Sequence, residues 1–342
     1  MIYFLIFIII FATLVVVHEL GHFIAAKKFG VAVNEFAIGM GPKLWSKKKN
    51  ETLYTLRLLP IGGYCAMEGE NEESNNPMAL TSKTPWQRII IFIAGAFMNV
   101  ILTWVLMLII LAYNGYASTI IDSVVPGSAI ELVGLQPGDQ IIAIDGIAVS
   151  KLTDVSALAD NDQIEYVMTI LDQNGVTKNI VIIPQIDENG NKVFGFYARS
   201  VKYDFFEILP ESFSETYIML KEVVNGFWML ITGSVSVKEM AGIVGVAQLT
   251  TEVWDVSIQE SIMFAIMNML KIAAILSANL AVLNLLPFPA LDGGRILFAL
   301  IELVRGKPLN QEKEAMFHFA GFVLLMILMV VVLYNDVTRL IV

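Results

Sequence analysis

The sequence is poor in histidine, cysteine and charge. Of 342 residues, three are histidines, one is a cysteine and 16% are charged, whereas about a quarter of an ordinary soluble domain is charged. The single Cys65 excludes an internal disulfide and leaves the redox compartment open. No basic stripe is present, which argues against a nucleic-acid partner. No removable signal peptide is expected, because the first apolar run lacks a basic segment before it.

Apolar residues dominate the composition of the chain. They make up 56% of the chain, and the mean hydropathy is +0.68, which indicates an α-helical polytopic membrane protein. The net charge is −10, and residues 114–215 carry fifteen Asp/Glu against five Lys/Arg. This segment therefore accounts for the whole net charge, which predicts an acidic soluble insert within the membrane protein.

About four transmembrane helices are expected. They fall at residues 1–26, 89–113, about 262–290 and 315–334, each long enough to cross a bilayer at about 1.5 Å per residue. The loop from Lys27 to Arg88 holds nine Lys/Arg and is expected on the cytoplasmic side. Both termini and the insert are then extracytoplasmic. Lys271 interrupts the third apolar run, and we expect it to snorkel at the outer interface.

Two further segments flank the predicted spans. The pattern of residues 31–65 predicts short strands and turns. We expect them to form a hairpin or small sheet on the cytoplasmic side of the membrane. An edge of this sheet could also pair with an extended peptide. Residues 68–84 are expected to be a flexible loop. Residues 205–257 are too polar to span and predict an interfacial helix followed by a loop. The membrane domain is thus expected in two halves, 1–113 and 258–342.

The insert, residues 115–200, alternates strand-like pieces with turns. Its sharpest turns are Gly134–Asp139 (Gly-Leu-Gln-Pro-Gly-Asp) and Asp145-Gly146. This arrangement resembles an α+β PDZ domain of bacterial membrane proteases, which binds a peptide end or strand by adding it to the sheet. The alternative is a β-rich spacer without a ligand.

A metal-binding pattern lies inside the first predicted span. His18-Glu19-Leu20-Gly21-His22 is an H-E-x-x-H motif, which on a helix puts both histidines on one face. They can share one Zn²⁺ while Glu19 accepts a proton from water. A five-residue motif alone is weak evidence for a metal site, because the same spacing can arise by chance. The alternative is that these polar residues are hydrogen-bonded groups in the core of the protein. Ionisable groups in hydrocarbon are expensive, however, which favours metal binding.

A second polar element interrupts the third predicted span. The stretch from Asn284 to Arg295 holds two prolines, two glycines and the carboxylate of Asp292, and broken helices at membrane depth are tolerated where they line a cavity. Basic residues after Asp292 put it near the cytoplasmic face, at the same depth as His18 and His22. Catalytic zinc takes three protein ligands and keeps an open position, so these three residues suffice. The alternative for Asp292 is a charge at a helix end facing the cytoplasm.

Together these motifs resemble one known family, the site-2 protease family of intramembrane zinc metalloproteases, in its bacterial form with an inserted PDZ domain. The resemblance rests on the H-E-x-x-H motif, Gly39-x-Gly41-Pro42, Gly62-Gly63-Tyr64, Asn99, the insert, and Asn284-x-x-Pro287-x-Pro289-x-Leu291-Asp292-Gly293. It implies one Zn²⁺ per chain held by His18, His22 and Asp292, with Glu19 catalytic. It implies substrate contacts at Asn284, Pro287, Gly39, Gly41, Gly62 and Gly63.

The resemblance also implies a substrate class and a location. Such enzymes sit in the cell membrane and cut single-pass proteins within the spanning segment, notably anti-sigma factors and signal-peptide remnants.

Two other classes of protein remain open. One is an H-E-x-x-H membrane protease acting on soluble-side substrates. A third ligand Glu one or two turns further along a helix would favour this class, and we find none in the sequence. The other is a non-catalytic PDZ scaffold. Asn99 is expected to pack helices together, with a reach toward the site as the alternative, and His318 is expected to be an interfacial histidine.

Overall fold

The computed structural model describes residues 2–70, 74–159, 163–187, 190, 192–234, 242–307 and 311–341. The chain divides into two compact units. The first comprises Met1–Ile109 and Pro210–Val342, and the second comprises Ile110–Leu209.

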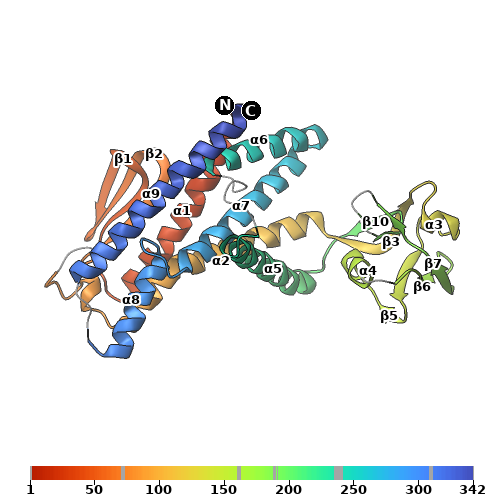
Figure 1. Cartoon of the computed structure of the whole chain (residues 1–342), viewed down its shortest axis with the longest axis horizontal. Coiled ribbons are helices and arrows are strands. Elements are labelled where there is room, and N and C mark those ends of the chain that lie inside the picture. The colour runs from red at the N-terminus through yellow and green to blue at the C-terminus, as the bar shows by residue number, and fades with distance from the viewer. Residues whose placement is uncertain are drawn as a thin grey trace. The chain divides into compact units, whose positions relative to one another are not determined.

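Four helices among the described residues are long and apolar enough to cross a membrane, as expected. They are α1 (Ile2–Lys28), α2 (Pro85–Asn114), α7 (Ile262–Leu285) and α9 (Gln311–Ile341) (Figure 1). α2 begins four residues earlier than expected because Thr84 and Gln87 cap it. The Gln87 N–H donates to the Thr84 hydroxyl, and the Thr84 N–H donates to the Gln87 side chain.

The third span ends earlier than its apolar run. α7 stops at Leu285, and α8 (Asp292–Arg305) begins after a six-residue break that contains both prolines of the motif. Proline lacks the N–H that a helix interior needs, so the chain turns here. At its other end, α7 begins at Ile262 because the Ser261 hydroxyl accepts from the Phe264 N–H. Lys271 therefore lies within α7, with an exposed side chain.

The predicted cytoplasmic-side β segment forms β1 (Val33–Lys49) and β2 (Thr52–Met67), and β2 packs against α1. Residues 35–38 have partners in both 53–56 and 63–66, so the first part of β1 lies between two parts of β2. Residues 63–67 thereby become an edge. Gly39, Gly41 and Gly62 have φ of +84°, +83° and +85°, a conformation that suits glycine and bends strands at irregularities in the pairing.

The segment expected to be a flexible loop, 68–84, is partly packed. Within its described residues, Leu80–Ser82 form a short 3₁₀ helix, and Leu80 is buried in the cluster that joins α1 to the β segment. The Leu80 N–H donates to the Glu68 carbonyl at 2.8 Å. Burial of Ala79 and Leu80 holds this stretch despite its polar composition.

Residues 205–257 contain more helix than expected. α5 (Phe205–Ile231) is the predicted helix, while α6 (Ile243–Glu260) occupies the end of the predicted loop; residues 235–241 of that loop lie outside the described part. The α6 N-terminus is capped from α9, because the Asp336 carboxylate accepts from the N–H groups of Gly242 and Gly245 at 3.0 and 2.9 Å.

The second unit is built around a sheet with strand order β10-β3-β4-β6-β7, with β5 paired to β4. Its elements are β3 (Tyr116–Val124), α3 (Ala129–Leu132), β4 (Gln140–Ile144), β5 (Ile147–Ala148), α4 (Leu152–Ala159), β6 (Tyr166–Leu171), β7 (Thr177–Ile182), β8 (Gln185–Ile186), β9 (Lys192–Val193) and β10 (Phe196–Val201). Asp145 and Gly146 have φ of 49° and 80°, as a two-residue hairpin between β4 and β5 requires.

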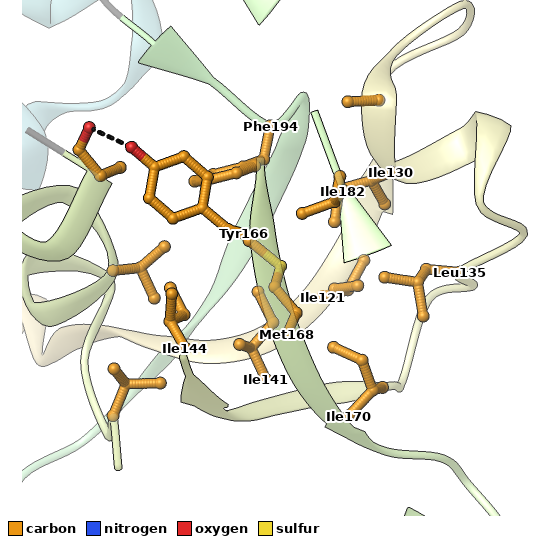
Figure 2. Close-up of a cluster of buried hydrophobic side chains, with 14 residues drawn as sticks. Ile121, Ile130, Leu135, Ile141, Ile144, Tyr166, Met168, Ile170, Ile182 and Phe194 are labelled. Atoms are coloured by element: carbon orange, nitrogen blue, oxygen red, sulfur yellow. Dashed lines mark hydrogen bonds between the residues drawn. The ribbon is translucent and has the colours of Figure 1, made fainter. Parts of the chain in front are cut away.

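The core of this unit comes from alternate residues of its central strands (Figure 2). Tyr166, Met168 and Ile170 of β6 are all buried, as the two-residue period of a strand predicts. The Tyr166 hydroxyl donates to the Ala159 carbonyl at 3.0 Å, which satisfies its one polar atom. The acidic insert therefore has a hydrophobic core of its own.

Candidate metal centre

The two histidines of α1 face the backbone of α2. A Cβ at Gly21 would lie 2.7 Å from the Ala94 carbonyl carbon and 2.9 Å from the Gly95 Cα, closer than side chains normally approach. The two helices can therefore touch only because small residues meet here. This close approach brings the Ile91 carbonyl within 2.8 Å of His22 Nδ1.

Asp292 reaches the same place because the break after α7 is tight. A Cβ on Gly293 would overlap the Leu285 and Leu286 backbone, and one on Gly294 would lie 2.5 Å from the Phe288 carbonyl oxygen. The two glycines let the first turn of α8 pack directly on the break. Asp292 is the first residue of α8, where the helix N-terminus favours a carboxylate.

The three candidate ligands form a small triangle. Asp292 Oδ2 lies 3.1 Å from His18 Nε2 and 3.2 Å from His22 Nε2, and the two Nε2 atoms are 3.2 Å apart. Both histidines are buried. Ligands bonded tetrahedrally to zinc at about 2.0–2.1 Å lie roughly 3.3 Å from one another. The triangle has the size of one face of a zinc tetrahedron.

The donor chemistry also fits a cation. A backbone carbonyl can only accept, so His22 Nδ1 carries the hydrogen in its contact with Ile91. The neutral ring then presents a lone pair from Nε2 toward the Asp292 carboxylate and toward the His18 ring. Lone pairs this close repel unless a proton or a metal ion lies between them. His18, His22 and Asp292 are thus suited to hold Zn²⁺.

A cavity of about 460 Å³ adjoins the triangle. It is lined by His18, Glu19, His22, Tyr64, Cys65, Ala66, Met67, Glu70, Phe92, Ala290, Asp292 and Arg295. Glu19 lines it on the α1 side, and Tyr64 to Met67 line it from β2. The 63–67 edge of β2 therefore forms one wall, directly beside Glu19.

The other predicted substrate contacts separate into two groups. The Asn284 side-chain nitrogen lies 3.2 Å from His18 Nε2, so this residue reaches the centre. Pro287 and the four glycines of the β segment are not among the described residues that line the cavity. Gly63 lies on the edge itself, whereas Gly39, Gly41 and Gly62 bend the strands behind it.

Charged groups close the cavity on the side of α8. Arg295 pairs with Glu70 and lies over the Phe92 ring. Burial lowers the pKa of Arg295, but the Glu70 carboxylate more than offsets this and the pKa is raised.

Burial and the neighbouring carboxylates of Glu19 and Glu70 raise the pKa of the Cys65 thiol. The thiol therefore stays protonated and unreactive at neutral pH.

Two residues near the centre make contacts that differ from their favoured interpretations. His318 of α9 accepts a hydrogen bond at Nδ1 from the Ala290 N–H at 3.1 Å, and Ala290 has a left-handed φ of 72°. His318 thus supports a strained residue two positions before Asp292. The Asn99 amide lies 3.3 Å from His18 Nδ1, which agrees with the alternative of a reach toward the site rather than with packing alone. Neither contact is local in sequence, so the pattern around each residue does not specify its partner.

Comparisons with known proteins agree with this chemistry. Residues 6–328 match the model of peptidase family M50. The chain is 32% identical to the zinc metalloprotease RasP of Bacillus licheniformis, with 98% of both chains covered. It is 32% identical to zinc metalloprotease RasP of Geobacillus kaustophilus over 97% of both chains. It is 33% identical to the regulator of sigma-W protease RasP of Bacillus subtilis over 98% of both.

The family match covers most of the chain, and these relatives are covered almost end to end. The chain therefore belongs to peptidase family M50, the site-2 protease family, and is a zinc metalloendopeptidase.

Proposed function

We propose that this enzyme cleaves single-pass membrane proteins within their transmembrane segments. The observation that carries the proposal is the position of the His18–His22–Asp292 triangle. Both histidines belong to a helix that is apolar and long enough to span a membrane, and a cavity beside them contains Glu19. A peptidase centre at this depth acts on peptide bonds in the bilayer rather than in water.

The chemistry is assigned as follows. His18, His22 and Asp292 would hold one Zn²⁺ per chain, which when bound polarises a carbonyl and acidifies water. Glu19 is the general base: its carboxylate takes the proton of the attacking water and delivers it to the leaving amine. Asn284, whose side-chain nitrogen lies beside His18, donates to the oxygen of the carbonyl under attack.

The substrate is held as an extended strand. A hydrogen-bonded helix hides its carbonyls, so a transmembrane substrate must unwind before it can be cut. The 63–67 edge of β2 lines the cavity through Tyr64 to Met67, and an extended peptide can add to this edge by main-chain hydrogen bonds. Gly39, Gly41, Gly62 and Gly63 give the edge its shape, and Pro287 keeps the chain between α7 and α8 out of a helix.

The proposed orientation follows from the basic loop between α1 and α2. With this loop in the cytoplasm, the metal centre lies toward the cytoplasmic face of the cell membrane, and both termini lie outside. The 115–200 unit is then an extracytoplasmic PDZ-like domain that takes a peptide end or strand at its sheet. Residues 205–257 lie on the outer membrane surface. The name of the Bacillus subtilis relative, regulator of sigma-W protease, supports anti-sigma factors as a substrate class.

The test is cleavage in cells of a single-pass protein already trimmed on its outer side. Wild type is compared with Glu19→Gln, which keeps the size of the side chain and removes the base. We expect a shortened product only with wild type, while both proteins bind zinc. Equal product from both would eliminate Glu19 as the base. Absence of both bound zinc and cleavage in the wild type would favour the scaffold alternative, whereas bound zinc without cleavage would point to unsuitable test substrates.

A further inference from the structure

The two histidines of the centre do not have equivalent support. The Nδ1 of His22 faces a backbone carbonyl at 2.8 Å. The Nδ1 of His18 faces the side-chain amide of Asn99, with the amide nitrogen at 3.3 Å. Asn99 is fully buried, and among the described residues its Oδ1 has no hydrogen-bond partner. A buried acceptor without a donor loses its hydrogen bonds to water and gains nothing in return, so this arrangement needs an explanation.

The tautomer of His18 decides which end of the amide faces it. If His18 holds a cation through Nε2, as proposed above, its Nε2 has no hydrogen and Nδ1 carries one. The Nδ1–H group and the Asn99 amide nitrogen are then two donors that face each other. The two ends of an asparagine amide have nearly the same shape and are assigned from their hydrogen bonds. Rotation by half a turn puts Oδ1 where it can accept from Nδ1–H.

The backbone of Asn99 is held in place independently of its side chain. The hydroxyl groups of Thr103 on α2 and Ser277 on α7 both donate to the Asn99 carbonyl, each at 2.9 Å. Thr103 and Ser277 are buried. The amide is therefore presented to His18 from a fixed point where two candidate spans meet.

We propose that Asn99 is a positioning residue for the metal centre. Its Oδ1 accepts a hydrogen bond from His18 Nδ1–H, which fixes the ring orientation and leaves the Nε2 lone pair directed at the metal. His18 and His22 then follow one rule: each donates its Nδ1–H to an acceptor on α2, an amide oxygen for His18 and the Ile91 carbonyl for His22. This inference rests on the proposed ligand set and gives Asn99 a role beyond helix packing.

The experiment compares acceptors at position 99 in the full-length protein in detergent. Zinc affinity is measured by competition with a chromophoric chelator, beside cleavage of the trimmed substrate. Asn99→Leu has a similar size but offers no acceptor, and we expect a 10- to 100-fold loss of zinc affinity, roughly the range for outer ligand partners. Asn99→Asp offers only acceptors and should remain close to wild type. Asn99→Ala, which lacks the acceptor but adds no bulk, should lose affinity as Asn99→Leu does.

The matched control is Thr103→Val. It removes one of the two hydroxyls on the Asn99 carbonyl and leaves both the Ser277 hydroxyl and the acceptor at Oδ1 in place, so zinc affinity should stay close to that of wild type. Wild-type zinc affinity in Asn99→Leu and Asn99→Ala would overturn the inference and leave the proposed function intact. An equal loss in Asn99→Asp and Asn99→Leu would also overturn it, because the acceptor would then not matter. Failure of wild type itself to bind zinc would refute the proposed ligand set instead.

Discussion

Gly95 is the position where the smallest change should damage the metal centre most. It lies on α2 directly beneath both imidazole rings. A Cβ added there would lie 2.7 Å from His22 Cε1 and 2.9 Å from His18 Cε1, and it would overlap His22 Nε2. We therefore predict that Gly95→Ala displaces the two histidines while the helix itself remains intact, since alanine is the better helix former.

The structure sets the size of the effect. Ordinary contacts of a Cβ begin near 3.4 Å, so each ring must retreat by about half an ångström or more. Zinc sites hold their ligand distances to within about 0.2 Å, so the rings cannot retreat and still bind as before. Overpacking of this kind costs about 1–3 kcal/mol, which corresponds to about one to two factors of ten in zinc affinity.

Zinc affinity and thermal unfolding of the zinc-free protein are the two measurements. The control is Gly226→Ala, also a helical glycine, where a Cβ meets nothing within 4 Å. We expect Gly226→Ala to bind zinc normally and Gly95→Ala to lose affinity with little change in the unfolding temperature. Unchanged zinc affinity in Gly95→Ala would refute the close packing of α2 against the histidines.

Two further predictions concern the supports of the site. His318→Leu leaves the N–H of the strained Ala290 without its acceptor. An unpaired buried N–H costs roughly 1–3 kcal/mol, so we expect zinc affinity to fall about tenfold. His318→Asn, whose Oδ1 replaces Nδ1, should restore the affinity, and equal affinity of both variants would contradict this role of His318. Burial raises the pKa of Glu35, but hydrogen bonds from Thr55 and Arg57 outweigh it and hold the pKa below 4.5. Glu35 therefore stabilises the β segment above pH 4.5, and this contribution is lost as the pH falls through the folded-state pKa. Glu35→Gln should reduce the fall of the unfolding temperature as the pH drops below 4.5. The same fall in Glu35→Gln and wild type would refute this contribution.

The sequence predicted those features whose cause is local. Four apolar runs predicted four candidate spans, because length and hydropathy are properties of each segment alone. The spacing of His18 and His22 specified one helix face in the same way. Asp292 could be joined to them only through the family resemblance and the shared side of the membrane, since 269 residues separate it from His22.

The features that escaped prediction depend on distant partners. α6 is capped by Asp336 from α9, which no pattern near residue 243 reveals. The role of His318 likewise arises where separate helices meet, and for Asn99 the sequence left helix packing and a reach toward the site as alternatives. The break after α7 was foreseen from Pro287, but its tightness depends on Gly293 meeting the backbone of Leu285. Tertiary contacts settle these positions, and a one-dimensional pattern does not contain them.

The central claim is that this enzyme cuts peptide bonds within the membrane. The most direct measurement reconstitutes the purified protein with a trimmed single-pass substrate in lipid vesicles and identifies the new termini by mass spectrometry, with Glu19→Gln and a chelator-treated sample beside it. The account predicts a cut inside the apolar segment of the substrate, toward its cytoplasmic end, that vanishes in both comparison samples. A cut confined to the soluble part of the substrate would contradict it.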